Sequence, residues 1–218
     1  MTLIKTRARG LKLDDTFAFT GTVSGAGDPA DVKLLATTTV SSGVASVDFV
    51  HGTNSVVFDS TYSVYKVFGV GLNVQTAGAE IFGQVTDGSS FKTSGYRSAT
   101  QQTYYNGSSS GEAVQAQTDG IEILRNLDSN STETCGFELT IYEPYTNSYQ
   151  VMNSISAGRD NATTANIYLE TSACFYNANI IATGVRLIPN SGNITGGVFK
   201  LYGIKWEMIG TFILYQLY

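Results

Sequence analysis

Charged side chains are scarce in this sequence of 218 residues. Asp, Glu, Lys and Arg together make up 14% of the chain, and hydrophobic residues make up 42%. An ordinary soluble domain carries roughly 25% charged residues, so this chain has few charges to keep a large free surface hydrated. We therefore expect further copies of the chain, or a partner protein, to cover much of its surface.

Positive charge in particular is lacking. The chain has 13 Lys and Arg against 18 Asp and Glu, which gives a net charge of −5. Such a balance provides no basic field to hold a phosphate backbone, and we expect no nucleic-acid partner. Lys5, Arg7, Arg9 and Lys12 do form a small basic run. Because no aromatic residues are interleaved with them, we interpret this run as a solvated arm or a contact with an acidic partner surface.

Hydrophobic runs long enough to cross a bilayer are absent as well. The most apolar stretch, residues 208–218, is about half as long as the roughly 20 residues that a membrane-spanning helix needs. Residues 1–9 hold charges where a signal peptide would need an apolar stretch. We expect no membrane partner and a soluble protein made in a reducing cytoplasm.

Cysteine and histidine are too few and too widely spaced for a metal or catalytic site. A disulfide between Cys135 and Cys174 is one alternative, but a chain of this length needs no covalent staple, and we expect two buried, reduced thiols. His51 is the only histidine, and the sequence contains neither a Gly-x-Ser-x-Gly motif nor a local zinc-ligand spacing. We therefore expect no catalytic residue, no metal and no cofactor.

Two glutamates supply the alternative of an enzyme. Glu138 and Glu170 each alternate with apolar neighbours and are expected to point away from the core. Two carboxyl groups about 5 to 10 Å apart on a concave face would suit glycoside hydrolysis. Outward-pointing charges are, however, what any half-buried strand shows. Glycosidase activity is therefore the less favoured hypothesis.

Helical patterns are missing, and the composition favours strands. The chain has 23 Gly, 13 Tyr and 11 Phe, and no long segment has apolar residues with a 3.6-residue period. No internal repeat of roughly 20 to 50 residues is visible, which argues against a solenoid or propeller. We predict an all-β, jelly-roll-like antiparallel β-sandwich. Residues 1–43 are predicted to form an extended N-terminal arm, residues 44–205 the sandwich, and residues 206–218 an apolar C-terminal extension.

Alternation of apolar and polar residues predicts which strand faces are buried. The predicted inward faces are Val47 and Phe49; Val64, Phe68, Val70, Leu72 and Val74; Phe137, Leu139 and Ile141; and Ile167 and Leu169. Gly69 and Gly71 lie opposite the second of these faces, which indicates a bulge or a close approach of backbone there.

Two apolar strands surround a polar turn in residues 180–204. The first strand alternates over residues 181–187, a turn follows at 189–193, and the second strand runs over residues 198–204. This order predicts a hairpin that closes the sandwich.

Residues 183–204 resemble the last hairpin of small jelly-roll modules in bacteriophage structural proteins; their sequence is TGVRLIPNSGNITGGVFKLYGI. Such modules occur on tail fibres, head fibres and capsid decoration proteins, notably of marine and cyanobacterial phages. Residues 19–27, FTGTVSGAG, are also similar to phage virion proteins. The resemblance implies a trimeric or otherwise multimeric virion component without catalysis. These modules often stop near the equivalent of Ile204, whereas this chain continues to Tyr218.

Subunit contacts are predicted at both ends of the chain. The extension 206–218 is β-prone and nearly uncharged, so it would favour aggregation if it were left exposed. Two interpretations are open: the extension packs on a neighbouring subunit, or it forms a last strand in the chain's own sheet. The predicted interface residues are Phe17, Phe19, Trp206, Phe212, Leu214 and Tyr218.

Tyrosines are the candidates for a binding role. A tyrosine ring combines apolar area with a hydrogen-bonding tip, which suits sugar stacking or protein contact. The candidate contact residues are Tyr104, Tyr105, Tyr145 and Tyr149. The alternative is that these tyrosines fill sandwich faces and subunit seams.

These observations predict a non-enzymatic structural protein of a bacteriophage virion: a capsid decoration or cement protein, a head fibre or a tail-associated subunit. Its expected partners are other capsid or tail proteins and further copies of itself, as a homotrimer or another homo-oligomer. We expect it to assemble in the host cytoplasm and to reside in the virion. The alternative is a carbohydrate-binding module of a phage appendage that recognises a host-surface glycan.

Overall fold

A computed structural model describes residues 32–105, 110–129, 135–159 and 167–205. These residues form strands and no helix, so the predicted all-β class is confirmed. In chain order the strands are β1 (Val32–Val40), β2 (Val47–Val50), β3 (Val64–Val74), β4 (Ala79–Thr86), β5 (Tyr96–Tyr105), β6 (Ser110–Gln117), β7 (Ile121–Leu127), β8 (Gly136–Tyr142), β9 (Val151–Arg159), β10 (Ile167–Tyr176), β11 (Gly184–Pro189) and β12 (Ile194–Ile204). The predicted interface residues Phe17, Phe19, Trp206, Phe212, Leu214 and Tyr218 lie outside the described residues.

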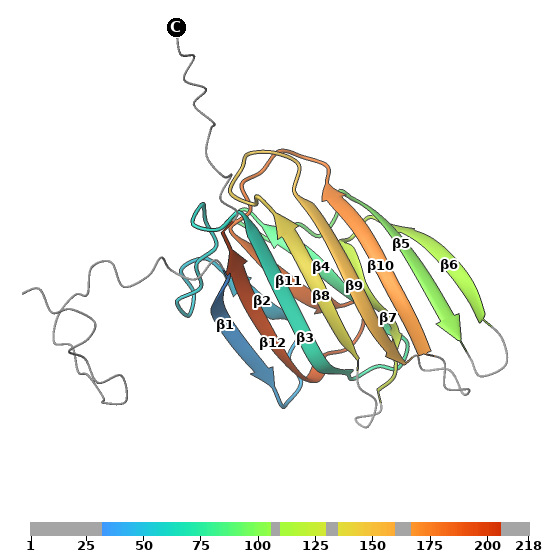
Figure 1. Ribbon diagram of the computed structural model, residues 1–218. Coiled ribbons are helices and arrows are strands. Elements are labelled where there is room, and N and C mark those ends of the chain that lie inside the picture. The colour runs from blue at the N-terminus through green and yellow to red at the C-terminus, as the bar shows by residue number, and fades with distance from the viewer. Residues whose placement is uncertain (1–31, 106–109, 130–134, 160–166, 206–218) are drawn as a thin grey trace, which may run out of the picture. The chain divides into compact units, whose positions relative to one another are not determined.

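The strands form two antiparallel sheets that pack face to face. The larger sheet has eight strands in the order β1-β12-β3-β8-β9-β10-β5-β6, and the smaller sheet has four in the order β2-β11-β4-β7. Figure 1 shows the larger sheet in front of the smaller one. The predicted β-sandwich is therefore confirmed. The described part of the chain contains no helix with the length and hydropathy needed to cross a membrane.

Four strand pairs are nested within one another along the chain. β1 pairs with β12, β2 with β11, β3 with β8, and β4 with β7. Successive pairs lie alternately in the larger and the smaller sheet, as though a long two-stranded ribbon were wound around the core. The other four strands form the hairpins β5-β6 and β9-β10, which extend the larger sheet beyond β8.

The predicted C-terminal hairpin is wrong in its pairing, although both of its strands form. β11 lies in the four-stranded sheet between β2 and β4, whereas β12 lies in the eight-stranded sheet between β1 and β3. The turn between them carries the chain from one sheet to the other. It is anchored by Asn190, whose N–H donates to the carbonyl of Glu80 (2.9 Å), while the Glu80 N–H donates to Asn190 Oδ1 (3.0 Å). A strand–turn–strand pattern does not specify which strand pairs with which. The sequence predicts pairing between neighbours in the chain, whereas β11 and β12 each pair with strands that are distant in the chain.

The eight-stranded sheet begins inside the segment that the sequence assigns to an arm. β1 is an edge strand of this sheet and pairs with β12, from Val32 opposite Ile204 to Val40 opposite Gly197. The side chain of Val40 belongs to the buried core. Residues 32–40 are therefore part of the sandwich.

The hydrophobic core lies between the two sheets. Phe49, Val185 and Leu187 point into it from the four-stranded sheet, and Leu139 and Ile141 point into it from the eight-stranded sheet. All five side chains are almost completely buried, which bears out the inward faces predicted at 47–49 and 137–141. Burying one such side chain contributes on the order of 1.5–3 kcal/mol.

β3 changes its buried face at a glycine. Gly71 has a φ of 63°, a left-handed conformation that glycine adopts without strain, and the pairing with β12 shifts register beside it. Leu72 is consequently buried, whereas Phe68 and Val70 point to solvent. The predicted single apolar face is wrong, while the bulge predicted at the glycines is confirmed.

β10 exposes its apolar residues and buries its polar ones. Ile167 and Leu169 are 63% and 49% exposed, whereas Tyr168 and Glu170 are 2% and 1% exposed. The sequence predicted the opposite orientation. Many of the inward neighbours on β5 and β9 are likewise small and polar: Ser98, Thr100, Ser154 and Ser156. The interior beside this part of β10 is therefore largely polar, and apolar side chains remain on the outer face.

Candidate interaction surface on the eight-stranded sheet

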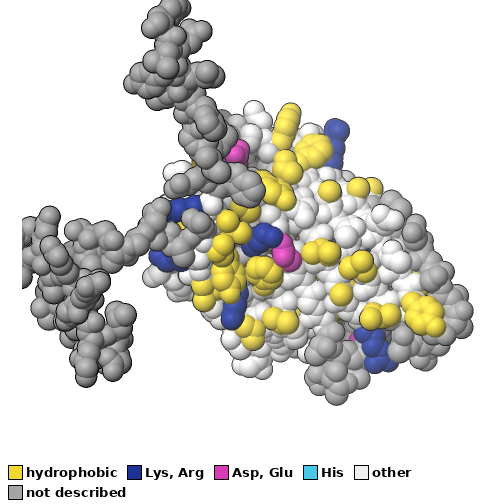
Figure 2. All heavy atoms as spheres, viewed as in Figure 1, with side chains coloured by type: hydrophobic (Ala, Val, Ile, Leu, Met, Phe, Trp, Pro, Cys, Tyr) yellow, Lys and Arg dark blue, Asp and Glu magenta, His cyan; other side chains and the backbone are white. Residues whose placement is uncertain are grey.

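The outer face of the eight-stranded sheet, which points away from the core, carries many apolar side chains (Figure 2). The register aligns them in rows that cross the strands. One row consists of Val32, Ile204, Val64, Tyr142, Val151 and Phe175. Monomeric soluble proteins rarely expose contiguous apolar patches larger than a few hundred Å². This face is therefore the strongest candidate for an interaction surface.

One part of this face is rich in apolar side chains, although Lys66 and Lys200 stand among them in register. We call it the apolar patch, and it consists of Val32 and Leu34 from β1, Phe68 and Val70 from β3, and Ile167 and Leu169 from β10. In register, only Gly136 and Ala157 lie between Val70 and Leu169, so no large polar side chain separates them. Figure 2 shows hydrophobic side chains gathered over β1, β12 and β3.

An ion pair lies beside the apolar patch. Lys66 of β3 and Glu138 of β8 form a salt bridge, and each side chain is 29% exposed. Glu138 stands opposite Phe68 in register, and the Phe68 ring packs edge-on against Tyr202 with 5.6 Å between the ring centroids. Because the two charges are paired, covering them with another surface costs less than covering an isolated charge.

The outer face is hollowed where small residues follow one another across the strands. Asn153 of β9, Ala173 of β10, Ala99 of β5 and Ala116 of β6 occupy one row in register. Two adjoining hollows of about 840 and 550 Å³ share Ala99 and Ala173 in their lining. We call them together the transverse groove, because their shared row of small residues crosses the strands.

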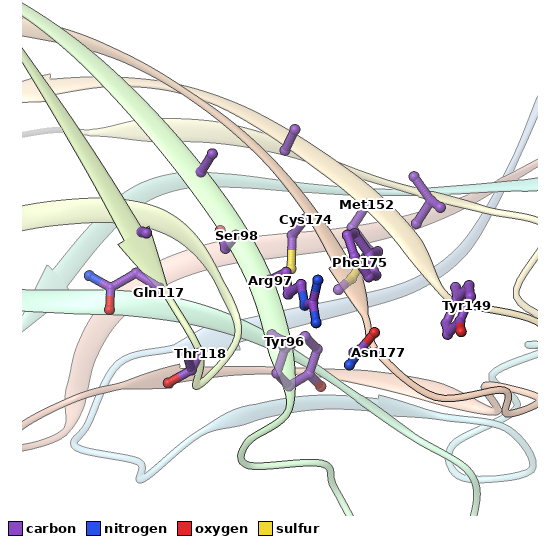
Figure 3. Close-up of a pocket in the computed structure, with 14 residues that line it drawn as sticks. Tyr96, Arg97, Ser98, Gln117, Thr118, Tyr149, Met152, Cys174, Phe175 and Asn177 are labelled. Atoms are coloured by element: carbon purple, nitrogen blue, oxygen red, sulfur yellow. The ribbon is translucent and has the colours of Figure 1, made fainter.

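Larger side chains from the neighbouring rows form the walls of the transverse groove. Val151, Phe175 and Arg97 stand in register on one side, and Ile155, Thr171 and Gln101 stand in register on the other. Figure 3 shows Tyr149 at one end of the larger hollow and Gln117 and Thr118 at the other.

Arg97 is the one charged residue among the described residues that line the transverse groove. Its guanidinium carbon lies 5.9 Å from the centroid of the Phe175 ring, a cation–π contact. The Phe175 ring in turn meets the Tyr149 ring at 5.9 Å between centroids. Within the described residues, Arg97 has no carboxylate partner. The groove thus combines aromatic faces, a floor of small residues and one uncompensated positive charge.

The connection between β8 and β9 positions the tyrosine at the end of the groove. Gln150 is buried there, and its side-chain amide nitrogen donates to the carbonyl oxygens of Ser148 (3.1 Å) and Ile180 (2.6 Å). These bonds tie the connection to the segment that follows β10. Tyr149 and Tyr145 line a further hollow beside the groove.

The four tyrosines predicted as contact residues lie at two separate places. Tyr145 and Tyr149 precede β9, whereas Tyr104 and Tyr105 are at the far end of β5. β5 has ten residues, so its two ends are about 30 Å apart. Tyr104 packs half-buried against the core, and Tyr105 is exposed. The structure therefore does not bring the two pairs together in one site.

The two glutamates considered for glycoside hydrolysis lie on opposite faces of the eight-stranded sheet. Glu138 points outward and pairs with Lys66, whereas Glu170 points inward and is almost completely buried. The expected outward orientation of Glu170 is wrong, because the polar interior at β10 reverses the alternation. Two carboxyl groups separated by a sheet cannot flank one glycosidic bond.

Glu170 instead belongs to a group of buried ionisable residues between the sheets. On β7, Arg125 donates to Glu122 through Nε to Oε1 (2.6 Å) and Nη2 to Oε2 (3.1 Å). A register shift in the pairing of β4 with β7 lets these two residues, three positions apart, share one side of the strand. Gln102 Nε2 donates to Glu170 Oε2 at 3.5 Å, and Glu170 Oε1 has no hydrogen-bond partner among the described residues.

Burial raises the pKa of Glu170 to about 8, and the negative charges of Glu122 and Glu80 raise it further, against the opposing effect of Arg125. Glu170 is therefore mostly protonated at neutral pH. A neutral carboxyl group avoids placing a further unpaired charge between the sheets, where the cost of an uncompensated charge is high.

The remaining candidate residues have structural roles. His51 Nδ1 accepts a hydrogen bond from the N–H of Phe58 (3.1 Å) in the connection after β2. Cys135 and Cys174 are free and buried, as expected, and burial raises the pKa of each thiol to about 12. Among the described residues, no three His, Cys, Asp or Glu side chains are grouped so that they could hold a metal ion.

Sequence reasoning identified Tyr149 but missed Arg97, Phe175 and the alanines of the floor. The signal in the sequence was an alternation of outward Arg97, Ala99 and Gln101 on β5. Alternation alone does not show which residues of β10 stand beside them, because that depends on the register between strands far apart in the chain.

Comparison with known proteins does not assign this chain to a family. No match was found in a scan against models of protein families, in a search of curated proteins or in a search of solved structures. Function is therefore inferred from the chain's own residues.

Proposed function

We propose that this chain is a non-enzymatic structural protein of a bacteriophage virion, built on a jelly roll, which assembles by joining the outer face of its eight-stranded sheet to further copies of itself. The apolar patch is the observation that carries this proposal. The patch residues lie on β1, β3 and β10, and we assign the contact to this part of the outer face. The contact leaves uncovered the row of small residues that crosses β9, β10, β5 and β6.

The nested strand pairs support the jelly roll. A jelly roll is a double-sheet sandwich of eight strands arranged as two Greek keys. The pairs β1-β12, β2-β11, β3-β8 and β4-β7 comprise eight strands divided equally between the two sheets. The hairpins β5-β6 and β9-β10 are additions to this set.

The resemblance of residues 183–204 to phage structural proteins supports the assignment to a virion. The low charge of the chain, 14%, supports a subunit whose surface is covered by neighbours. The mechanism is association: apolar side chains leave water at each contact, and closed symmetry repeats that contact around the assembly. Other capsid or tail proteins are the further partners.

Sedimentation of the purified full chain tests assembly through this face. We expect a multimer at micromolar concentration and a monomer for the double variant Val70→Lys with Leu169→Lys, because lysine ammonium groups are costly to bury in an apolar contact. The matched control is Ser42→Lys with Ala77→Lys, which adds the same charge at exposed turns and is expected to leave the multimer intact. A monomeric wild type, or a patch variant that assembles like wild type, would overturn the proposal.

A further inference from the structure

The walls of the transverse groove carry both apolar and hydrogen-bonding side chains. Val151 and Phe175 stand on one wall, and Thr171 and Gln101 are exposed on the other. Asn153 Oδ1 accepts a hydrogen bond from the Tyr142 hydroxyl at 2.7 Å, so its amide nitrogen is left to donate to a ligand. A ligand that fits must offer apolar faces and hydroxyl groups side by side.

The charge of the groove favours an anion. Among the residues whose side chains the structure describes, its lining includes Arg97 and no Asp or Glu, in a chain whose net charge is −5. The contact with the Phe175 ring holds the Arg97 guanidinium at the wall. Such a guanidinium presents two parallel N–H groups that match a carboxylate.

The direction of the groove favours a sugar over a peptide. A peptide that adds to a sheet needs a free strand edge for its main-chain hydrogen bonds. The floor of the groove crosses β9, β10 and β5, each of which is paired on both sides, and ends on the edge strand β6. A peptide crossing these strands would find no backbone partners for its N–H and C=O groups. A sugar ring needs only an aromatic face and side-chain hydrogen bonds.

We propose that the transverse groove binds a uronic-acid residue within an acidic polysaccharide. Phe175 and Tyr149 stack against sugar rings, and Arg97 pairs with the carboxylate. Ala99 and Ala173 leave the space that a ring needs above the sheet. This activity is separate from assembly, because it does not use the residues of the apolar patch.

Calorimetric titration of the full chain tests the proposal. The probes are short uronate oligosaccharides (galacturonate, glucuronate and mannuronate) and their methyl esters, which keep the rings and remove the charge. We expect at least one uronate to bind and its methyl ester to bind more weakly by roughly tenfold or more, because a charge-assisted hydrogen-bonded pair is lost.

Three variants separate the roles of charge and shape. Arg97→Gln should abolish the preference for acid over ester while retaining weak binding of both. Ala99→Trp should block both, because the indole fills the floor. Ala77→Trp is the matched control, since Ala77 is an exposed turn residue outside both the lining of the groove and the apolar patch, and it should bind as wild type does. The sedimentation behaviour of Arg97→Gln and Ala99→Trp should match that of wild type, which distinguishes failure of binding from failure of assembly.

Three results would overturn the proposal: no uronate in the set binds at millimolar concentration, acid and ester bind equally, or Ala99→Trp binds as wild type does. An oligoglutamate that binds with the same dependence on Arg97, when no uronate does, would assign the groove to acidic peptides instead.

Discussion

Replacing Glu170 by Gln tests whether a protonated carboxyl group lies between the two sheets. Glu170 is almost completely buried on β10, and its Oε1 atom has no hydrogen-bond partner among the described residues. Burial first, and then the charge of Glu122, raise its pKa from 4.5 to about 8. Glutamine has nearly the same shape and no charge, so the substitution preserves packing and removes the ionisation.

The higher pKa in the folded state makes stability depend on pH. Below about pH 4.5 the Glu170 carboxyl group is protonated in both the folded and the unfolded chain, so it does not lower the free energy of unfolding. From there to about pH 8 the unfolded chain loses this proton while the folded chain keeps it, so the free energy of unfolding falls by about 1.4 kcal/mol per pH unit. Above about pH 8 the loss stays constant at roughly 3–5 kcal/mol. The Glu170→Gln variant carries no such loss.

Urea denaturation between about pH 5 and about pH 8.5 measures this difference. We expect Glu170→Gln to be more stable than wild type at the alkaline end, with the gap narrowing toward the acidic end. Glu138→Gln is the matched control: it makes the same chemical change on the outer face, where losing the pair with Lys66 should cost less than about 1 kcal/mol. The same pH slope for wild type and Glu170→Gln would refute the reasoning.

Three further outcomes follow from the packing. Arg125→Met leaves the Glu122 carboxylate buried without its partner. Chemical denaturation should show a free energy of unfolding lower by about 3–5 kcal/mol. A loss below about 1 kcal/mol would mean that water reaches this carboxylate. Gly83→Ala places a Cβ atom 2.8 Å from a core isoleucine side chain and should cost about 1–3 kcal/mol; an unchanged denaturation midpoint would contradict the close approach. Cys135 and Cys174 should resist iodoacetamide until the chain is denatured, because burial raises the pKa of both thiols; labelling of the native protein in mass spectrometry would show that they are accessible.

The all-β class and much of the core could be predicted from the sequence, because alternation is a local property. Val47 and Phe49 are buried as their spacing predicts, and so are Leu139 and Ile141. These strands keep one register over their whole length. The four-residue strand β2, for example, contains no bulge that could exchange its faces.

The errors arose where alternation is interrupted or reversed. At Gly71 the bulge exchanges the two faces of β3, so Val70 is exposed although it is separated by only one residue from buried Leu72. On β10 the interior is polar, so the apolar residue Leu169 faces outward and Glu170 faces inward. Both outcomes depend on partners in distant strands, and a single sequence does not identify those partners.

The candidate groove was predictable only in part for the same reason. Tyr149 was recognised as an aromatic residue in a turn-rich segment. Ala99 and Ala173 become a floor only when β5 and β10 align, and Arg97 reaches Phe175 only through that alignment. None of these residues is unusual within its own segment.

The transverse groove and the apolar patch lie largely on different strands of the larger sheet. Every residue in the floor of the transverse groove comes from β5, β6, β9 or β10, whereas four of the six residues of the apolar patch come from β1 and β3, which belong to the nested pairs. Substitutions on the hairpins β5-β6 and β9-β10 can therefore change the shape of the groove, while the four nested strand pairs and most of the apolar patch keep their residues. If the groove binds a ligand as we propose, its specificity can therefore change while the strands that form the nested pairs stay the same.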